Sequence, residues 1–303
     1  MNIILKALLA NAKKAKGGNS APPVPFMKIK AEKQDRPLPG ELLEENDIPY
    51  ADPAKGLFAD VVFPKKKETK TLPIVIFVHG GALVTGDRKA DRVFCQELAL
   101  KGFVVYSVEY RLIDRADAYG MVSDIFDAFE MVRNTAGRFG GDPDRVSLCG
   151  ESAGAFICIY AAAGESKTLR KIFGIKKEPL HISHLILFSG MIYTTGIDLI
   201  GTVYRRALFG KKNLGLGSMK KLSPDNPKLL RYLPPVYLVS SDADFMSGNT
   251  LDFAKALRRW HHDYKLMYYP IGEELTHAFP ALLPSLPEST EVIDAVSEWI
   301  TGA

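Results

Sequence analysis

A serine lies between two glycines in the segment Gly150-Glu151-Ser152-Ala153-Gly154. Residues 145–149 before it have the pattern of a buried strand, and residues 153–163 after it are small and apolar, as in a helix. A Gly-x-Ser-x-Gly segment between a strand and a helix forms a sharp turn that raises the serine hydroxyl above the sheet edge. The glycines permit a strained turn and a close passage of the helix against neighbouring strands. The pattern therefore predicts that Ser152 is a nucleophile.

A serine hydroxyl needs a base to accept its proton, and that base is usually a histidine oriented by a carboxylate. The six histidines of the chain are His79, His181, His184, His261, His262 and His277. The first five either precede the serine or lie at the wrong end of the predicted strands. His277 follows the last predicted strand and precedes the terminal helix, at the sheet edge where sites of parallel sheets are built. We expect His277 to be the base.

Two carboxylates compete to orient this histidine. Asp242 and Asp244 both follow the strand predicted at 236–239, in the chain order serine, acid, histidine that this arrangement requires. We prefer Asp244, because Asp242 is expected still to lie at the strand end. Either carboxylate could orient His277.

The oxygen that gains negative charge during attack on a carbonyl needs backbone N–H groups fixed in advance. One is expected from Ala153, the residue after the nucleophile. Others are expected from a glycine-rich loop after an earlier central strand, and His79-Gly80-Gly81-Ala82 occupies that place. Glycines let the backbone turn its N–H groups toward a substrate.

The elements that must position these residues alternate along the chain. Strands are predicted at 57–63, 73–78, 103–108, 146–149, 185–188, 236–239 and 266–269, and helices at 122–132, 153–163, 199–209, 251–260 and 292–300, the last with Ser289 or Thr290 as N-cap. Apolar residues recur at helical spacing in the helices, and the central strands are apolar on both faces. This alternation predicts a doubly wound, mostly parallel eight-stranded sheet with helices on both faces.

Two segments interrupt the alternation. About forty residues separate the strands at 185–188 and 236–239, which is far longer than an ordinary crossover loop. We expect a small helical cap at about 191–232, joined over the active-site face by an N-terminal cap segment, residues 1–56. Prolines in residues 17–53 are expected to prevent long regular elements there. The catalytic domain is then 57–303.

Composition limits the functional class. The 303 residues carry a net charge of only +4 and short lysine runs such as Lys65-Lys66-Lys67, so we expect no nucleic-acid partner. The three cysteines match no zinc spacing, and Cys149 and Cys158 lie in apolar runs, which indicates buried free thiols and a reducing compartment. Residues 1–10 are apolar but short, and most lysines follow them, so we expect an amphipathic helix, no signal peptide and no membrane span. A cytoplasmic location is expected.

These features together resemble the α/β-hydrolase esterases and lipases, and specifically their hormone-sensitive-lipase-like branch. The matching segments are His79-Gly80-Gly81, Tyr110-Arg111-Leu112, Gly141-Asp142-Pro143, Gly150–Gly154 and the pair Asp244 and His277. They cover the chain from about Leu57 to its end. Asp244-Phe245-Met246 resembles the family's Asp-Pro-Leu, which favours Asp244 over Asp242. The resemblance implies that Gly81 and Ala82 donate to the oxyanion while Gly80 shapes the loop.

The chain departs from the family pattern around its site. Ala82 stands where a third glycine is usual, Leu83 where an aromatic residue is common, Ile113-Asp114-Arg115 where Ala-Pro-Glu is usual, and Ala155 replaces a common glycine. These changes affect the expected substrate range more than the triad.

The resemblance implies a serine carboxylic-ester hydrolase that forms an acyl-enzyme on small or short-acyl esters, such as acetyl esters, without metal or organic cofactor. An amide hydrolase, such as an arylformamidase or a peptidase, could use the same residues. A third hypothesis is a non-catalytic binding protein with the hydrolase fold, although such proteins usually lose a member of the triad. The expected partner is a small ester, and a homodimer is left open.

Overall fold

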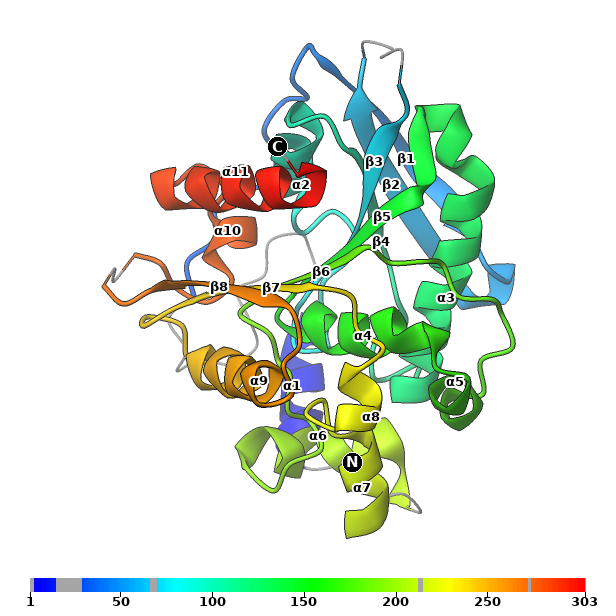
Figure 1. Cartoon of the computed structure of the whole chain (residues 1–303), viewed down its shortest axis with the longest axis vertical. Helices are drawn as coiled ribbons and strands as arrows, with labels where there is room; N and C mark the ends of the chain where they lie inside the picture. Colours follow the sequence, from blue (N-terminus) through cyan, green and yellow to red (C-terminus); the bar gives the residue numbers. More distant parts are fainter. Residues whose placement is uncertain (1–2, 15–28, 66–69, 212–214, 272–273, 303) are drawn as a thin grey trace.

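The computed structural model describes residues 3–14, 29–65, 70–211, 215–271 and 274–302 (Figure 1). Within these ranges eight strands form one sheet in the order β1-β2-β4-β3-β5-β6-β7-β8. The strands are β1 (Leu42–Tyr50), β2 (Leu57–Pro64), β3 (Leu72–Val78), β4 (Val104–Val108), β5 (Gly141–Glu151), β6 (His184–Phe188), β7 (Val236–Ser241) and β8 (Tyr264–Tyr269). β2 pairs antiparallel with β1 and with β4, and every other pairing is parallel. The expected doubly wound α/β-hydrolase sheet is confirmed.

Helices cover both faces of the sheet (Figure 1). One face packs against α3 (Ala118–Thr135), α4 (Ala153–Ala162) and α9 (Ser247–Arg259), and the other against α2 (Arg92–Leu100), α10 (Phe279–Leu282) and α11 (Pro287–Thr301). Successive side chains of a strand point to opposite faces. In β3, Ile74 and Ile76 therefore enter the first core, while Val75 and Phe77 enter the second.

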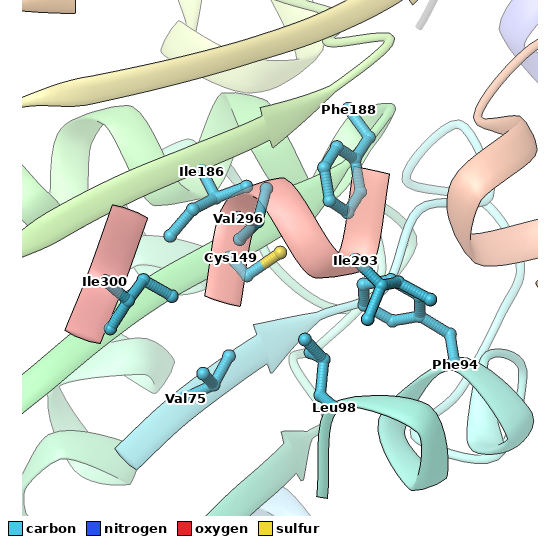
Figure 2. A pocket seen from close by; sticks show the side chains of 9 residues that line it. All are labelled: Val75, Phe94, Leu98, Cys149, Ile186, Phe188, Ile293, Val296 and Ile300. Atoms are coloured by element: carbon cyan, nitrogen blue, oxygen red, sulfur yellow. The ribbon is translucent and has the colours of Figure 1, made fainter. Parts of the chain in front are cut away.

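The core under α11 is closely packed. Figure 2 shows side chains of β3, β5 and β6 meeting those of α11, with Val75, Cys149 and Ile186 on the sheet side and Ile293 and Val296 on the helix. The space between them has no room for a water molecule. All three cysteines of the chain are buried and unpaired, which confirms the expectation of free thiols.

The strand β1 corrects the expectation that residues 17–53 hold no long regular element. It lies at the edge of the sheet and pairs only with β2, so it needs hydrogen bonds along one side alone. An edge strand tolerates a proline such as Pro49, which has no N–H to donate. The ladder also shifts register between Glu45 and Ile48, and Asp47 there has a φ of 59°.

The described parts of residues 1–56 occupy three different places. Helix α1 (Ile3–Lys14) buries Leu5 and Leu9 and contacts α6 (Leu199–Phe209), as an amphipathic helix should. Residues 29–36 instead run beside α2 and α10, where the Glu32 N–H donates to Leu282 O. Because β1 then joins the sheet, this arrangement differs from the single N-terminal cap segment expected over the active-site face. Residues 15–28, together with Lys66 and Lys67, lie outside the described residues.

The described residues of the long insertion include the helices α6, α7 (Leu216–Leu222) and α8 (Pro227–Leu230), which Figure 1 shows grouped at one end of the molecule. Two further short helices are α5 (Lys167–Phe173) and the 3-10 helix Pro53–Lys55. No helix among the described residues is both long enough and apolar enough to cross a bilayer.

Helix α11 begins earlier than its sequence indicates. We expected Ser289 or Thr290 to cap it, but the helix starts at Pro287, with Leu286 in the N-cap position. Proline is favoured at the first helical position, where its missing N–H has no partner to lose. The Ser289 hydroxyl donates instead to Phe279 O, which ties α11 to α10.

Candidate active site

Ser152 occupies the turn between β5 and α4, with φ 50° and ψ −113°. Its backbone is held from both sides: its N–H donates to Phe188 O at 2.9 Å, and its C=O accepts from Met191 N–H at 2.8 Å. Gly154 has to be a glycine, because a Cβ there would lie 2.0 Å from Val78 O. The close passage of α4 over the end of β3 thus has the steric basis that the sequence suggests.

The structure brings Ser152, His277 and Asp244 together in one hydrogen-bonded chain. Ser152 Oγ lies 2.7 Å from His277 Nε2, and His277 Nδ1 lies 2.7 Å from Asp244 Oδ1. All three side chains are buried. The distances match the nucleophile–base–orienter geometry that activates a serine.

The surroundings of Asp244 keep it ionised. Burial by itself would raise the pKa of this carboxyl, but the hydrogen bond and charge of His277 outweigh that effect, so the pKa is lowered. The Ser240 hydroxyl donates to Oδ2 at 2.6 Å and the Met246 N–H to Oδ1 at 2.8 Å. The competing Asp242 is exposed and its carboxylate accepts from the Tyr268 hydroxyl.

Unusual backbone conformations gather around these residues. Five of the eight non-glycine residues with positive φ in the described ranges belong to the loops of this site: Ala82, Leu83, Ser152, Ser189 and Ala278. Such strain persists where surrounding contacts enforce it and is concentrated at functional sites. Here the Ala278 N–H donates to Ser189 Oγ at 2.8 Å, which anchors the residue directly after His277.

The loop after β3 presents backbone donors on the same side. The N–H groups of Gly81, Ala82 and Ala153 have no hydrogen-bond partner among the residues that the structure describes. The N–H of Gly80, by contrast, donates to the buried carboxyl of Glu151. Gly80 therefore cannot donate to a substrate in this conformation and acts through the shape of the loop.

His79 and Tyr110 hold the carbonyl group of Gly80. Their rings stack with centroids 4.5 Å apart, and the Tyr110 hydroxyl donates to both His79 O and Gly80 O. Burial lowers the pKa of His79 to about 4, so its ring is neutral at ordinary pH and Nδ1 donates to Gly80 O at 3.0 Å. His79 is thus a support for the loop.

Sequence reasoning missed several of these supports. The serine motif includes Glu151 without assigning it a role, and the sequence pattern does not point to Asp91, yet both residues are buried. Tyr204 of α6 was also missed; its hydroxyl donates to Ala82 O at 2.9 Å. A charged residue inside an otherwise apolar strand end, as at Glu151, is the signal that could have pointed to one of them.

Phe245 borders the triad. The Phe245 ring packs on His277 with centroids 4.3 Å apart, although 45% of Phe245 remains exposed. An exposed aromatic ring beside the base is suited to contact a bound molecule.

The chain is similar to several known proteins. The family model BD-FAE matches residues 59–245, which is more than half of the chain. A probable isoprenylcysteine alpha-carbonyl methylesterase of Oryza sativa subsp. japonica is 29% identical over 73% of this chain and 55% of its own length. A versiconal hemiacetal acetate esterase of Dothistroma septosporum is 25% identical over 79% of this chain and 76% of its own. The chain spans about half the length of the methylesterases it matches.

Solved structures share the fold. Esterase B of Lactobacillus rhamnosis, in a form carrying an inhibitor, superposes with a TM-score of 0.78 at 24% identity, covering 88% of this chain and 89% of that one. An acetyl ester-xyloside bifunctional hydrolase of Caldicellulosiruptor lactoaceticus superposes with a TM-score of 0.63 at 22% identity, covering 84% and 92%. The chain therefore belongs to the BD-FAE family, and its fold is that of the α/β-hydrolase esterases.

Proposed function

We propose that this protein is a serine carboxylic-ester hydrolase that acts on esters of short acyl groups through an acyl-enzyme. The observation that carries the proposal is the continuous hydrogen-bonded chain from Ser152 through His277 to Asp244, with 2.7 Å at each step. The nearby N–H groups of Gly81, Ala82 and Ala153 supply a site for the oxyanion. These parts need no metal or organic cofactor.

In the proposed reaction Ser152 Oγ attacks the ester carbonyl while its proton passes to His277 Nε2. The carbonyl oxygen takes up the electron pair and is stabilised by the N–H groups of Gly81, Ala82 and Ala153. When the tetrahedral intermediate collapses, the bond to the alcohol breaks and His277 returns the proton to the leaving oxygen. Water then attacks the acyl-enzyme by the same route, releasing the acid and restoring Ser152. Asp244 stays ionised throughout and holds the imidazolium.

The preference for short acyl groups has two supports. The Ala82 side chain stands where related proteins usually have a glycine, so its methyl group narrows the space beside the oxyanion donors. The name of one relative points the same way, since it is an acetate esterase. Small groups on at least one side of the ester bond would suit such a site.

A panel of p-nitrophenyl esters with acyl chains of rising length tests the proposal. We expect the highest kcat/KM on the acetate or the butyrate, and a loss of ~1,000-fold or more in kcat for Ser152→Ala. A fluorophosphonate should label Ser152 in the wild type and leave Ser152→Ala unlabelled.

The matched anilides separate the alternative on the same triad. Faster turnover of an acetyl anilide than of the corresponding ester would mean that the protein is an amide hydrolase. Failure of the wild type on every ester, together with no labelling of Ser152, would refute the proposal altogether.

A further inference from the structure

Two buried carboxyls lie beneath the loop that carries the oxyanion donors. Glu151 is 4% exposed and accepts the Gly80 N–H. Asp91, directly before α2, is 1% exposed, and neither of its oxygens has a hydrogen-bond partner among the described residues. Within those residues neither carboxyl forms an ion pair with a lysine or arginine. Buried carboxylates without a cation are costly and are normally avoided.

The two carboxyls influence each other. Burial, and then the charge of Asp87, raises the pKa of Asp91 to about 7. Burial, and then the charge of Asp91, raises the pKa of Glu151 well above its ordinary value, although the hydrogen bond from Gly80 opposes this. Two like charges in a buried site cannot both ionise easily, so the pair titrates as a unit.

Among the described residues, no titratable group that faces the pair compensates for its charge. The titratable neighbours are Asp87 and His79 in the loop after β3, Cys95 on α2, Tyr110 after β4, Cys149 on β5 and Asp244 after β7. His79 is neutral above its lowered pKa of about 4, and the thiols and phenol are neutral when protonated. The remaining neighbours are anionic.

We propose that Asp91 and Glu151 form a proton-retaining pair that positions the oxyanion loop of this hydrolase. While the pair keeps at least one proton, the Glu151 carboxyl stays against the Gly80 N–H. The main chain of Gly80 is then held at both of its polar groups. Glu151 accepts from its N–H, and His79 and Tyr110 donate to its C=O. This leaves the N–H groups of Gly81 and Ala82 free for the oxyanion.

The proposal sets the direction of a pH effect. Below the raised pKa values the pair retains its proton and the loop is held. As the pH rises through those values the last proton leaves, two buried negative charges repel, and Glu151 is displaced from Gly80. The value of kcat should then fall on the alkaline side. Asn in place of Asp91 leaves only one ionisable carboxyl, so two negative charges can no longer form in the buried site and this fall should disappear.

The inference rests on the proposed ester hydrolysis, and p-nitrophenyl acetate serves as the probe, with Ser152→Ala as the blank for spontaneous hydrolysis. Wild type, Asp91→Asn, Glu151→Gln and Glu151→Ala are compared from about pH 6 to about pH 10. Glu165→Gln, an exposed glutamate far from the loop, is the control. The melting temperature of each variant shows whether it folds.

We expect Glu151→Ala to lower kcat by roughly 10- to 100-fold with KM changed by less than about threefold, because oxyanion donors act mainly on the transition state. Glu151→Gln should recover most of this loss, since its amide oxygen still accepts the Gly80 N–H. Asp91→Asn should abolish this alkaline limb of kcat, because only one negative charge can then form in the buried site. The acidic limb should stay in place, because the pair already keeps a proton there.

Three results would overturn the inference while the wild type remains an active esterase. These are wild-type kcat in Glu151→Ala, a loss in Glu151→Gln as large as in Glu151→Ala, or an alkaline limb that is absent in the wild type or unchanged in Asp91→Asn. If Glu151→Ala does not fold, the pH profile of Asp91→Asn decides alone. A wild type without esterase activity would instead refute the proposed function.

Discussion

At the scale of single residues, Asp244 and Asp242 show how two adjacent carboxylates acquire different roles. The strand β7 ends at Ser241, and the Asp242 N–H still pairs with Tyr269 O. Asp242 thus continues the edge of the sheet and exposes its side chain to solvent. Asp244 lies where the chain turns inward, and it is buried against His277.

This difference predicts a ranking of two matched substitutions. Asp244→Asn should lower kcat by up to about 10⁴-fold, because a neutral amide no longer stabilises the imidazolium or selects the tautomer with a proton on Nδ1. Asp242→Asn should change kcat by less than about threefold, since its carboxylate contacts only the Tyr268 hydroxyl. Initial rates on p-nitrophenyl acetate at neutral pH measure both. The reverse ranking would mean that Asp242 orients the base.

Residue types and chain order were enough to propose Ser152, Asp244 and His277, because few histidines and carboxylates follow strand ends. They were not enough to find Glu151 and Asp91. Glu151 fills a position of the motif that accepts many residues, and Asp91 has the appearance of an ordinary helix N-cap. Their roles come from burial beneath a loop that is distant in sequence, and burial of this kind is a property of the tertiary structure.

At the scale of elements, the contact between α4 and β3 depends on the missing side chain of Gly154. A Cβ would meet the main chain at Val78 O, which cannot rotate away as a flexible side chain could. The start of α4 and the end of β3 carry Ala153 and the oxyanion loop respectively. Their spacing therefore bears directly on the site.

Gly154→Ala should reduce both stability and activity. Forcing a methyl group against main chain costs about 1–3 kcal/mol or more, and any shift of α4 displaces Ser152 and the Ala153 N–H. We expect a lower melting temperature and a loss of ~10-fold or more in kcat and in the rate of labelling by a fluorophosphonate.

Gly248→Ala is the matched control. Gly248 lies in α9, has no atom within 4 Å of the position of a Cβ, and does not have positive φ. The same substitution there should raise stability by up to about 1 kcal/mol and leave kcat unchanged. Equal behaviour of the two variants would contradict the steric account of Gly154.

Periodicity predicted most elements because the central strands and the helices bury regular apolar faces. It failed at β1, where polar residues, prolines and a bulge hide the strand, and where pairing with β2 supplies the order. It also failed at the start of α11, because a serine was favoured as a cap over the proline that begins the helix. The positions of edge strands and of helix ends depend on contacts with neighbouring elements more than on the local sequence pattern.

At the scale of the whole molecule, the cap helix α6 is part of the hydrolase core. Leu208 is fully buried, and Phe209 packs on Phe156 of α4 with ring centroids 6.3 Å apart. The hydroxyl of Tyr204 reaches Ala82 in the oxyanion loop. One apolar core thus includes α6, α3, α4 and the sheet. Such a helix should unfold together with the domain, unlike a lid that opens by itself.

Two leucines of α6 test this coupling with the same substitution. Leu208→Ala should lower the free energy of unfolding by about 2–5 kcal/mol, because it leaves a cavity in the shared core. Leu199→Ala, at the start of the same helix, where the residue is 66% exposed, should change it by no more than about 0.5 kcal/mol. Chemical denaturation followed by circular dichroism measures both values.

The temperature dependence of activity then distinguishes a cap helix that unfolds together with the domain from a lid that opens independently. In Leu208→Ala we expect esterase activity and helical signal to be lost in the same thermal transition, below that of the wild type. A lid that opens by itself would lose order or change KM in Leu208→Ala while the main transition stayed at the wild-type temperature. Since α6 touches both the core and Ala82, loosening it at Leu208 should weaken the whole domain before it alters access to Ser152.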